Sequence, residues 1–98
     1  MTQKRAPIHP GEVLAEDFML PRSLSANQLA LALRVPPSRL AEMIRGRHSI
    51  SADTALRLAR YFETTTAFWM NLQSRYDLDV ARDKAGKQIE REVTVATE

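Results

Sequence analysis

The stretch that decides the fold is residues 25–46, SANQLALALRVPPSRLAEMIRG. It begins with Ser25, a residue favoured at the N-cap because its hydroxyl accepts a hydrogen bond from an amide of the first helical turn. Leu29 and Leu33 follow four residues apart, so they lie on one face of a helix. We expect this helix to be short and to end at Pro36, because proline does not continue a helix.

Two prolines separate this helix from the next one. Pro36 stiffens the turn, and Pro37 falls at about the first position of a second helix, where the fixed φ of proline is already helical and no amide is needed. The second helix is expected over residues 37–45, with Gly46 as its C-terminal stop. The two prolines therefore fix the angle at which the second helix is presented.

The apolar and small residues of both helices have the spacing of a helix-turn-helix: Leu29, Ala30, Leu33, Val35, Leu40 and Met43. A small residue at position 30 allows the two helices to cross closely. In this motif the second helix enters the major groove of DNA with its N-terminal residues.

The exposed face of the second helix offers three candidates for contacts with base edges: Ser38, Arg39 and Glu42. Arg39 suits guanine, whose O6 and N7 accept two hydrogen bonds from one guanidinium. Glu42 has two interpretations. It accepts from a cytosine amine, or it pairs with Arg39 or Arg45, and we favour the pairing.

The ends of the two motif helices offer candidates for contacts with DNA phosphates: Asn27, Gln28, Arg45, Arg47 and His48. The first two lie in the first turn of the first helix, and the others lie at the end of the second helix and in the loop after it. Such positions commonly contact the DNA backbone. The alternative is that these side chains form a solvated polar face on a packing module.

Charge is distributed unevenly along the 98 residues, whose formal net charge is +2. Residues 34–60 contain six arginines against two acidic residues, a local balance of +4, whereas acidic residues outnumber basic ones from Asp77 onward. Arginine suits bidentate contacts with phosphate and guanine. The position of the arginines around the motif therefore favours a nucleic-acid partner.

The rest of the chain also has helical periodicity. One helix is expected over residues 12–20, ended by Pro21. Another begins after an N-cap at Ser51, and its i, i+3, i+4, i+7 pattern predicts which side chains it buries: Ala55, Leu58, Ala59 and Phe62.

A fifth helix is expected over residues 67–83, after a cap at Thr65 or Thr66, with Gly86 as its stop. The residues after it alternate loosely between apolar and polar, as in an edge strand or a disordered tail. The sequence thus predicts an all-α, five-helix chain with three parts: an N-terminal arm (1–10), a DNA-binding domain (11–84, with its motif at about 25–46) and a C-terminal tail (85–98).

The start of the fifth helix is rich in aromatic residues. We expect Phe68 and Leu72 in the core. Trp69 and Met70 cannot both face the same core as Phe68, and aromatic side chains and methionine are common at interfaces. Trp69 and Met70 are therefore candidates for a dimer interface, and Trp69 is alternatively a core residue.

Several classes of function lack the residues that they need. The chain has no cysteine, and its only histidines, His9 and His48, are far apart in the sequence. It has no metalloprotease, phosphate-loop or nucleophile-elbow motif, so we expect no enzyme activity, no metal and no cofactor. No apolar stretch approaches the roughly 20 residues of a membrane span, and the first residues lack the apolar segment of a signal peptide, so we expect none. We expect a cytoplasmic protein.

Three segments resemble the HigA/VapI-type antitoxins of bacterial toxin–antitoxin modules, within the Xre-like helix-turn-helix group: HPGEVLAEDF (9–18), VPPSRLAEMIRGRHSISADTALRLARYF (35–62) and FWMNLQSRYDLDVAR (68–82). The resemblance covers roughly three quarters of the chain, and it implies an Xre/lambda-repressor-like fold. The chain departs from the wider pattern at three positions. Ala26 replaces a common glutamine, and Arg34 and Glu63 stand where glycine is common.

The resemblance implies an antitoxin that neutralises a ribonuclease toxin of the RelE-like fold and binds the operator of its own operon as a dimer. Such toxins are typically basic, which suits the acidic residues after Asp77. The toxin-binding element is the N-terminal arm, the fifth helix or the tail. The alternatives are a stand-alone phage- or plasmid-type repressor without a toxin, and an interaction module without affinity for DNA.

Overall fold

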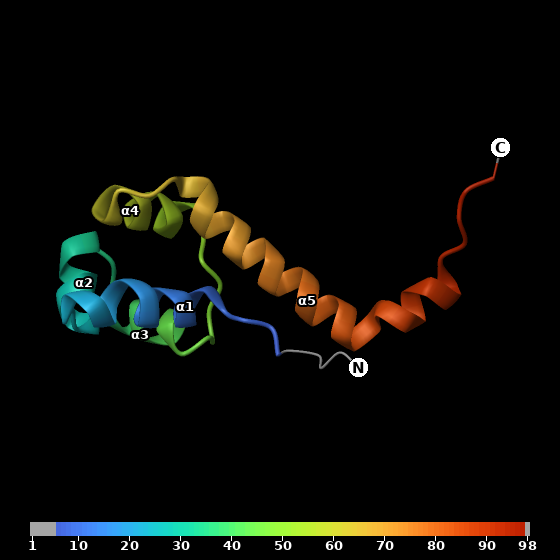
Figure 1. Cartoon of the computed structure of the whole chain (residues 1–98), viewed down its shortest axis with the longest axis horizontal. Coiled ribbons are helices and arrows are strands. Elements are labelled where there is room, and N and C mark those ends of the chain that lie inside the picture. Colours follow the sequence, from blue (N-terminus) through green and yellow to red (C-terminus); the bar gives the residue numbers. More distant parts are fainter. Residues whose placement is uncertain (1–5, 98) are drawn as a thin grey trace.

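A computed structural model describes residues 6–97, which form helices and no strand. In chain order the helices are α1 (Pro10–Val13), the π-helix η1 (Leu14–Met19), the 3-10 helix η2 (Leu20–Arg22), α2 (Ala26–Leu33), α3 (Pro37–Ile44), α4 (Ala52–Phe62) and α5 (Thr66–Glu92). The elements from α1 to α4, with the start of α5, form a body from which the rest of α5 extends (Figure 1). The predicted all-α class is confirmed.

The first helical segment changes its pitch twice, which differs from the regular helix expected over residues 12–20. The amide of Leu20 bonds to the carbonyl of Ala15, five residues back, in the π register. Pro21 lies inside the 3-10 turn that follows, and the segment ends at Ser23, whose φ is 51°. Pro21 does not end the segment, because proline is accepted in the first turn of a helix, where no amide is needed.

The two motif helices form as expected, with one difference at the turn. Ser25 and Gln28 make a reciprocal capping box at the start of α2, and Pro37 occupies the first turn of α3 after Pro36. However, α2 ends at Leu33 because Arg34 takes a left-handed conformation with a φ of 61°. The helix therefore stops before Pro36, at the position where glycine is common in related motifs.

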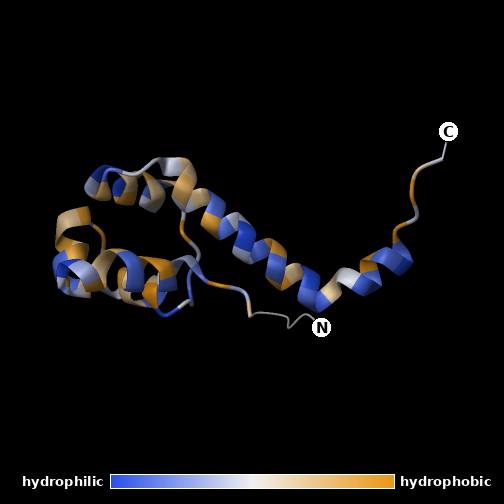
Figure 2. Ribbon diagram, in the orientation of Figure 1, coloured by the Kyte–Doolittle hydropathy of each residue, from blue (hydrophilic) through white to orange (hydrophobic). Residues whose placement is uncertain are grey.

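A single hydrophobic core lies between the helices of the body. The apolar residues predicted on α2, α3 and α4 are all buried, and the fully buried large side chains include Leu14, Leu29, Leu40, Leu58 and Trp69. Figure 2 shows many apolar residues in the helices of the body, whereas hydrophilic residues alternate with some apolar ones along the extended part of α5. This core fixes the orientation of α3.

Trp69 belongs to this core, so the prediction that it lies at a dimer interface is wrong. Its side chain is 0% exposed, its ring centroid lies 4.9 Å from that of Phe18, and its Nε1 donates a hydrogen bond to Thr64 Oγ1 at 2.8 Å. Phe68, expected in the core, is 37% exposed and packs on the edge of Trp69. The sequence did not reveal which of the two adjacent aromatic residues faces inward.

The fifth helix is longer than expected. Thr65 caps it by accepting a bond from the amide of Phe68, as predicted, but it runs through Gly86 to Glu92. One glycine costs a helix only about 1 kcal/mol relative to alanine, and most residues around it are good helix formers. The expected strand or disordered tail is therefore wrong for residues 85–92, while 93–97 have no regular structure.

Candidate nucleic-acid interface

The buried face of α3 determines which of its side chains face solvent. Leu40 and Met43 are buried against the core, and Ser38 and Arg39 are exposed on the other side of the helix. The first turn of α3 thus presents the two side chains that we predicted for base edges. Within residues 6–97 Arg39 has no acidic partner, so its guanidinium is free to bind another molecule.

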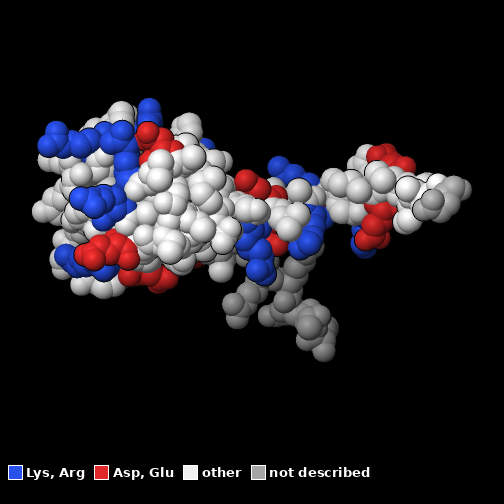
Figure 3. Space-filling model, turned by 90° about the horizontal axis from the view of Figure 1, so that it is seen from above, with Lys and Arg blue, Asp and Glu red and all other residues white. Residues whose placement is uncertain are grey.

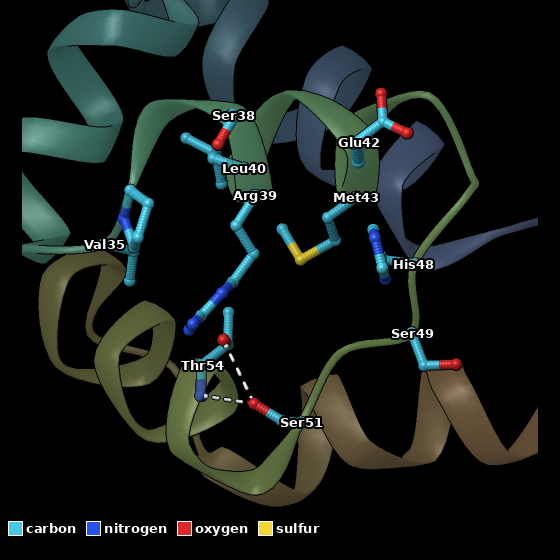
Figure 4. A pocket seen from close by; sticks show the side chains of 11 residues that line it. Val35, Ser38, Arg39, Leu40, Glu42, Met43, His48, Ser49, Ser51 and Thr54 are labelled. Atoms are coloured by element: carbon cyan, nitrogen blue, oxygen red, sulfur yellow. Dashed lines mark hydrogen bonds between the residues drawn. The ribbon is translucent and has the colours of Figure 1, made fainter.

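An open groove of about 510 Å³ separates α3 from the start of α4. Arg39 reaches across this groove from α3 towards Thr54 of α4, while His48 and Ser49 line it from the connecting loop (Figure 4). Ser51 accepts a bond from the amide of Thr54 at 3.2 Å, which caps the N-terminus of α4. Ser49 and Thr54 are not among the residues predicted from the sequence, although the N-cap at Ser51 lies close to both in the chain.

Glu42 holds two arginines at the other end of α3. Its carboxylate lies 3.5 Å from Arg45 Nη1 and 3.2 Å from Arg47 Nη1. The favoured interpretation of Glu42 as an ion-pairing residue is confirmed, with Arg45 and Arg47 rather than Arg39 as its partners. Both arginines remain exposed, so the pairing orients them without removing them from solvent.

The two candidate phosphate contacts on α2 differ in whether their side chains already make a hydrogen bond within the protein. Asn27 is exposed, and its side chain makes no hydrogen bond within the described part of the chain. The Oε1 atom of Gln28 accepts a bond from the amide of Ser25 at 2.9 Å. This bond leaves the side-chain NH₂ of Gln28 as a donor, which is the group that a phosphate oxygen requires.

Arg57 is a structural residue among the central arginines. Its Nε donates to Asp53 at 2.7 Å, and its Nη1 donates to the carbonyl of Leu33 at 2.9 Å. It therefore satisfies one of the last carbonyls of α2 and connects α4 to α2. The i, i+4 spacing of Asp53 and Arg57 is a signal for the first contact, but only the fold reveals the second.

Basic side chains gather on the body. Figure 3 shows them at the end of the body that lies opposite the tip of α5, with acidic side chains interleaved, and a second group of basic side chains lies along α5. A surface of this kind attracts a polyanion, and the exposed first turn of α3 lies in the same body.

Comparison with known proteins agrees with this geometry. The helix-turn-helix family matches residues 16–69, from η1 to the start of α5. The chain belongs to this family. It is 53% identical over 74 residues to virulence-associated protein I of Dichelobacter nodosus, a match that covers 76% of this chain and 68% of that protein.

Two solved structures place the chain more narrowly. An addiction-module antidote protein of the HigA family from Coxiella burnetii has a TM-score of 0.90 and 52% identity, covering 94% of this chain and all of that one. The Pseudomonas aeruginosa antitoxin HigA, solved with the higBA promoter, has a TM-score of 0.90 and 46% identity, covering 93% and 99%. This helix-turn-helix protein therefore belongs to the HigA group, as the three resembling segments predict.

Two further observations concern other kinds of site. In the described residues no helix is both long enough and apolar enough to cross a membrane. Nor does any group of three His, Cys, Asp or Glu side chains between residues 6 and 97 have the arrangement of a metal site.

Proposed function

We propose that this protein is an antitoxin that binds the operator of its own operon as a dimer and neutralises a RelE-like ribonuclease toxin in the cytoplasm. The observation that carries the DNA-binding part is the exposed first turn of α3, where Arg39 has no acidic partner and lies between candidate phosphate contacts. The Pseudomonas aeruginosa HigA solved with promoter DNA supports the same part.

In the proposed complex α3 lies in the major groove. Arg39 donates to O6 and N7 of a guanine, and Ser38 contacts a neighbouring base edge. Asn27, Gln28, Arg45, Arg47 and His48 contact phosphates on either side of the groove, which fixes the register of the protein on DNA.

Dimerisation is proposed to use the extended part of α5. Leu78, Ala81, Ala85 and Ile89 follow one another at helical spacing, so they form an apolar stripe along one face. Leu78 is 47% exposed and Ile89 is 50% exposed in the single chain. A second copy covers this stripe with its own, because a two-fold axis brings the same surface of both chains together. Met70, which is 36% exposed, remains a candidate at the margin.

The DNA-binding part is tested by fluorescence anisotropy with the DNA upstream of the gene and with a scrambled duplex, across a salt series. We expect binding to the upstream duplex to be at least about a thousandfold tighter. Equal and strongly salt-dependent binding to both duplexes would leave only a basic surface that attracts phosphates, and would refute operator recognition.

The antitoxin part is tested by co-expression with each small protein encoded next to the gene. We expect one of these proteins to stop growth and degrade RNA when expressed alone, and to be neutralised and co-purified by this chain. A native operon without such a companion would instead support the stand-alone repressor.

A further inference from the structure

We propose that His9 is a positioning residue that holds the loop between α3 and α4 in its DNA-binding arrangement and connects that loop to α5. This inference rests on the proposed operator binding for its effect on affinity. Its geometry rests on three contacts that converge on one buried imidazole.

The first contact places His9 at the N-cap of α1. Its Nδ1 accepts a hydrogen bond from the amide of Gly11 at 2.9 Å. His9 is buried, with only 8% of its surface exposed. Because Nδ1 accepts, the ring proton is on Nε2, and the other edge of the ring is the donor.

The second contact is with the loop after α3. The ring of His9 packs against Gly46, where an added Cβ would lie 3.5 Å from His9 Cγ, and its interaction with the backbone of His48 raises the pKa of His9. His9 thus contacts the segment that carries two candidate phosphate contacts, Arg47 and His48.

The third contact is with α5. The rings of His9 and Tyr76 meet edge to face, with centroids 4.8 Å apart. Three residues earlier on α5, Gln73 accepts a bond from the amide of Ile50 at 2.8 Å, and its Nε2 donates to Asp77. The α3–α4 loop is therefore held from α5 at two points, directly through Gln73 and indirectly through His9.

The residue after the cap strengthens this arrangement. A Cβ on Gly11 would lie 2.1 Å from the carbonyl oxygen of Met43 and 2.9 Å from Ile44 Cα. The first turn of α1 thus lies directly against the backbone of the last turn of α3. Residues 9–11, which we call the N-terminal clasp, therefore contact both the end of the recognition helix and the loop that follows it.

The titration of His9 provides a readout that an ordinary core residue lacks. Burial lowers the pKa of His9 below 6.5, opposed by the interaction with the His48 backbone and by the charges of Asp77 and Glu12. The groups that face it are Glu12 on α1, His48 in the loop, and Tyr76 and Asp77 on α5. A proton on Nδ1 would oppose the amide of Gly11 as a second donor, so protonation disrupts the clasp.

Two substitutions separate the two edges of the ring. His9→Asn keeps an acceptor near the position of Nδ1 but has no donor that reaches His48. His9→Gln has an amide nitrogen that reaches about as far as Nε2, but it lacks the acceptor of the cap. Thermal unfolding of each variant reports the cap, and anisotropy on the upstream duplex reports the position of the loop.

We expect a crossed result. His9→Asn keeps most of the thermal stability and binds the upstream duplex about three- to tenfold more weakly, the size of effect expected for one polar contact, with little change on scrambled DNA. His9→Gln loses more stability and recovers most of the affinity. Affinity that simply follows stability in both variants, or wild-type affinity in His9→Asn, would overturn the proposal and leave His9 as a helix cap.

A measurement on the free wild-type protein keeps the proposal testable without DNA or folded variants. The amide NMR signals of residues 47–50 are expected to titrate together with the His9 ring. His48→Gln is the control, because it removes the titratable ring in the loop and keeps the backbone that His9 contacts. Loop signals that follow His48 and ignore His9 would overturn the proposal, whereas failure of the upstream duplex alone would refute only operator binding.

Discussion

Three residues in this chain take a left-handed backbone conformation without being glycine: Ser23, Arg34 and Glu63, at φ values of 51°, 61° and 56°. Arg34 and Glu63 end α2 and α4. A side chain in this conformation costs roughly 1–2 kcal/mol. The ends of α2 and α4 therefore lower the stability of the fold, and the burial of the core offsets this cost.

The strain at Glu63 predicts a stabilising substitution away from the DNA-binding face. Glu63→Gly is expected to raise the free energy of unfolding by about 1 kcal/mol. Urea denaturation measures this change. Glu63→Ala is the matched control, because it removes the same charge and keeps the strain; a glycine variant no more stable than the alanine variant would contradict the explanation.

The buried imidazole of His9 predicts a pH dependence of stability. Its pKa is lowered from 6.5 in the folded chain, so at pH values just below 6.5 the unfolded chain binds more protons than the folded one. The contribution of His9 to the free energy of unfolding is therefore fully present above pH 6.5. It falls as the pH drops towards the pKa that His9 has in the folded chain. Unfolding free energies measured from about pH 8 to pH 5 are expected to show this loss in the wild type and to show less of it in His9→Asn.

At the scale of the elements, the sequence predicted most where a local signal and burial agree. Ser25, Ser51 and Thr65 cap their helices as expected, and the apolar pattern of α4 matches its buried face. Prediction from the sequence failed where the orientation of a side chain depends on contacts between helices. The inward turn of Trp69 is decided by Phe18, which lies some fifty positions away in the chain, and no local pattern encodes that contact.

The candidate interface shows the same division. Exposure of Ser38 and Arg39 followed from the position of the prolines and the apolar face of α3. The structural role of Arg57 and the convergence on His9 did not follow, because both join segments that are distant in the sequence. The spacing of residues on one helix is visible in a sequence, whereas contacts between helices are not.

The continuity of α5 predicts the effect of removing its glycine. An added Cβ at Gly86 would meet only Arg82 Cβ, at 3.9 Å, so there is room for alanine. Gly86→Ala is expected to stabilise the helix locally by about 1 kcal/mol and to slow amide exchange around position 86. Gly11→Ala is the contrasting variant, because its Cβ has no room beside Met43, and it is expected to destabilise the fold. Equal effects of the two substitutions would contradict the packing described here.

At the scale of the whole molecule, the protein is elongated, with extents of 53 × 34 × 23 Å. The body contains α3, and the extension is the C-terminal part of α5, which contains Leu78 and Ile89 (Figure 1). In the proposed dimer the extension joins the two copies and the bodies contact DNA. The two recognition helices must then lie one DNA turn apart, about 34 Å.

The stripe predicts that a charge on it separates the two copies. Leu78→Glu combined with Ile89→Glu is expected to give a monomer in light scattering, because burying two carboxylates in an apolar interface is strongly unfavourable. The affinity for the operator is expected to fall as well, because a monomer contacts only one half of the site. Lys87→Glu, at an exposed position on the opposite face of α5, is the control for added charge, because Lys87 is not at i, i+3 or i, i+4 spacing from the residues of the stripe. A double variant that remains a dimer would place the interface elsewhere.

The most direct test of operator recognition by α3 is the effect of Arg39→Ala on both upstream and scrambled DNA, with Arg47→Ala alongside. We predict that Arg39→Ala costs about 1–3 kcal/mol on the upstream duplex and much less on the scrambled one, while Arg47→Ala weakens both alike and flattens the salt dependence. Equal losses on both duplexes for Arg39→Ala would contradict the account, because a side chain that reads a base must discriminate between sequences.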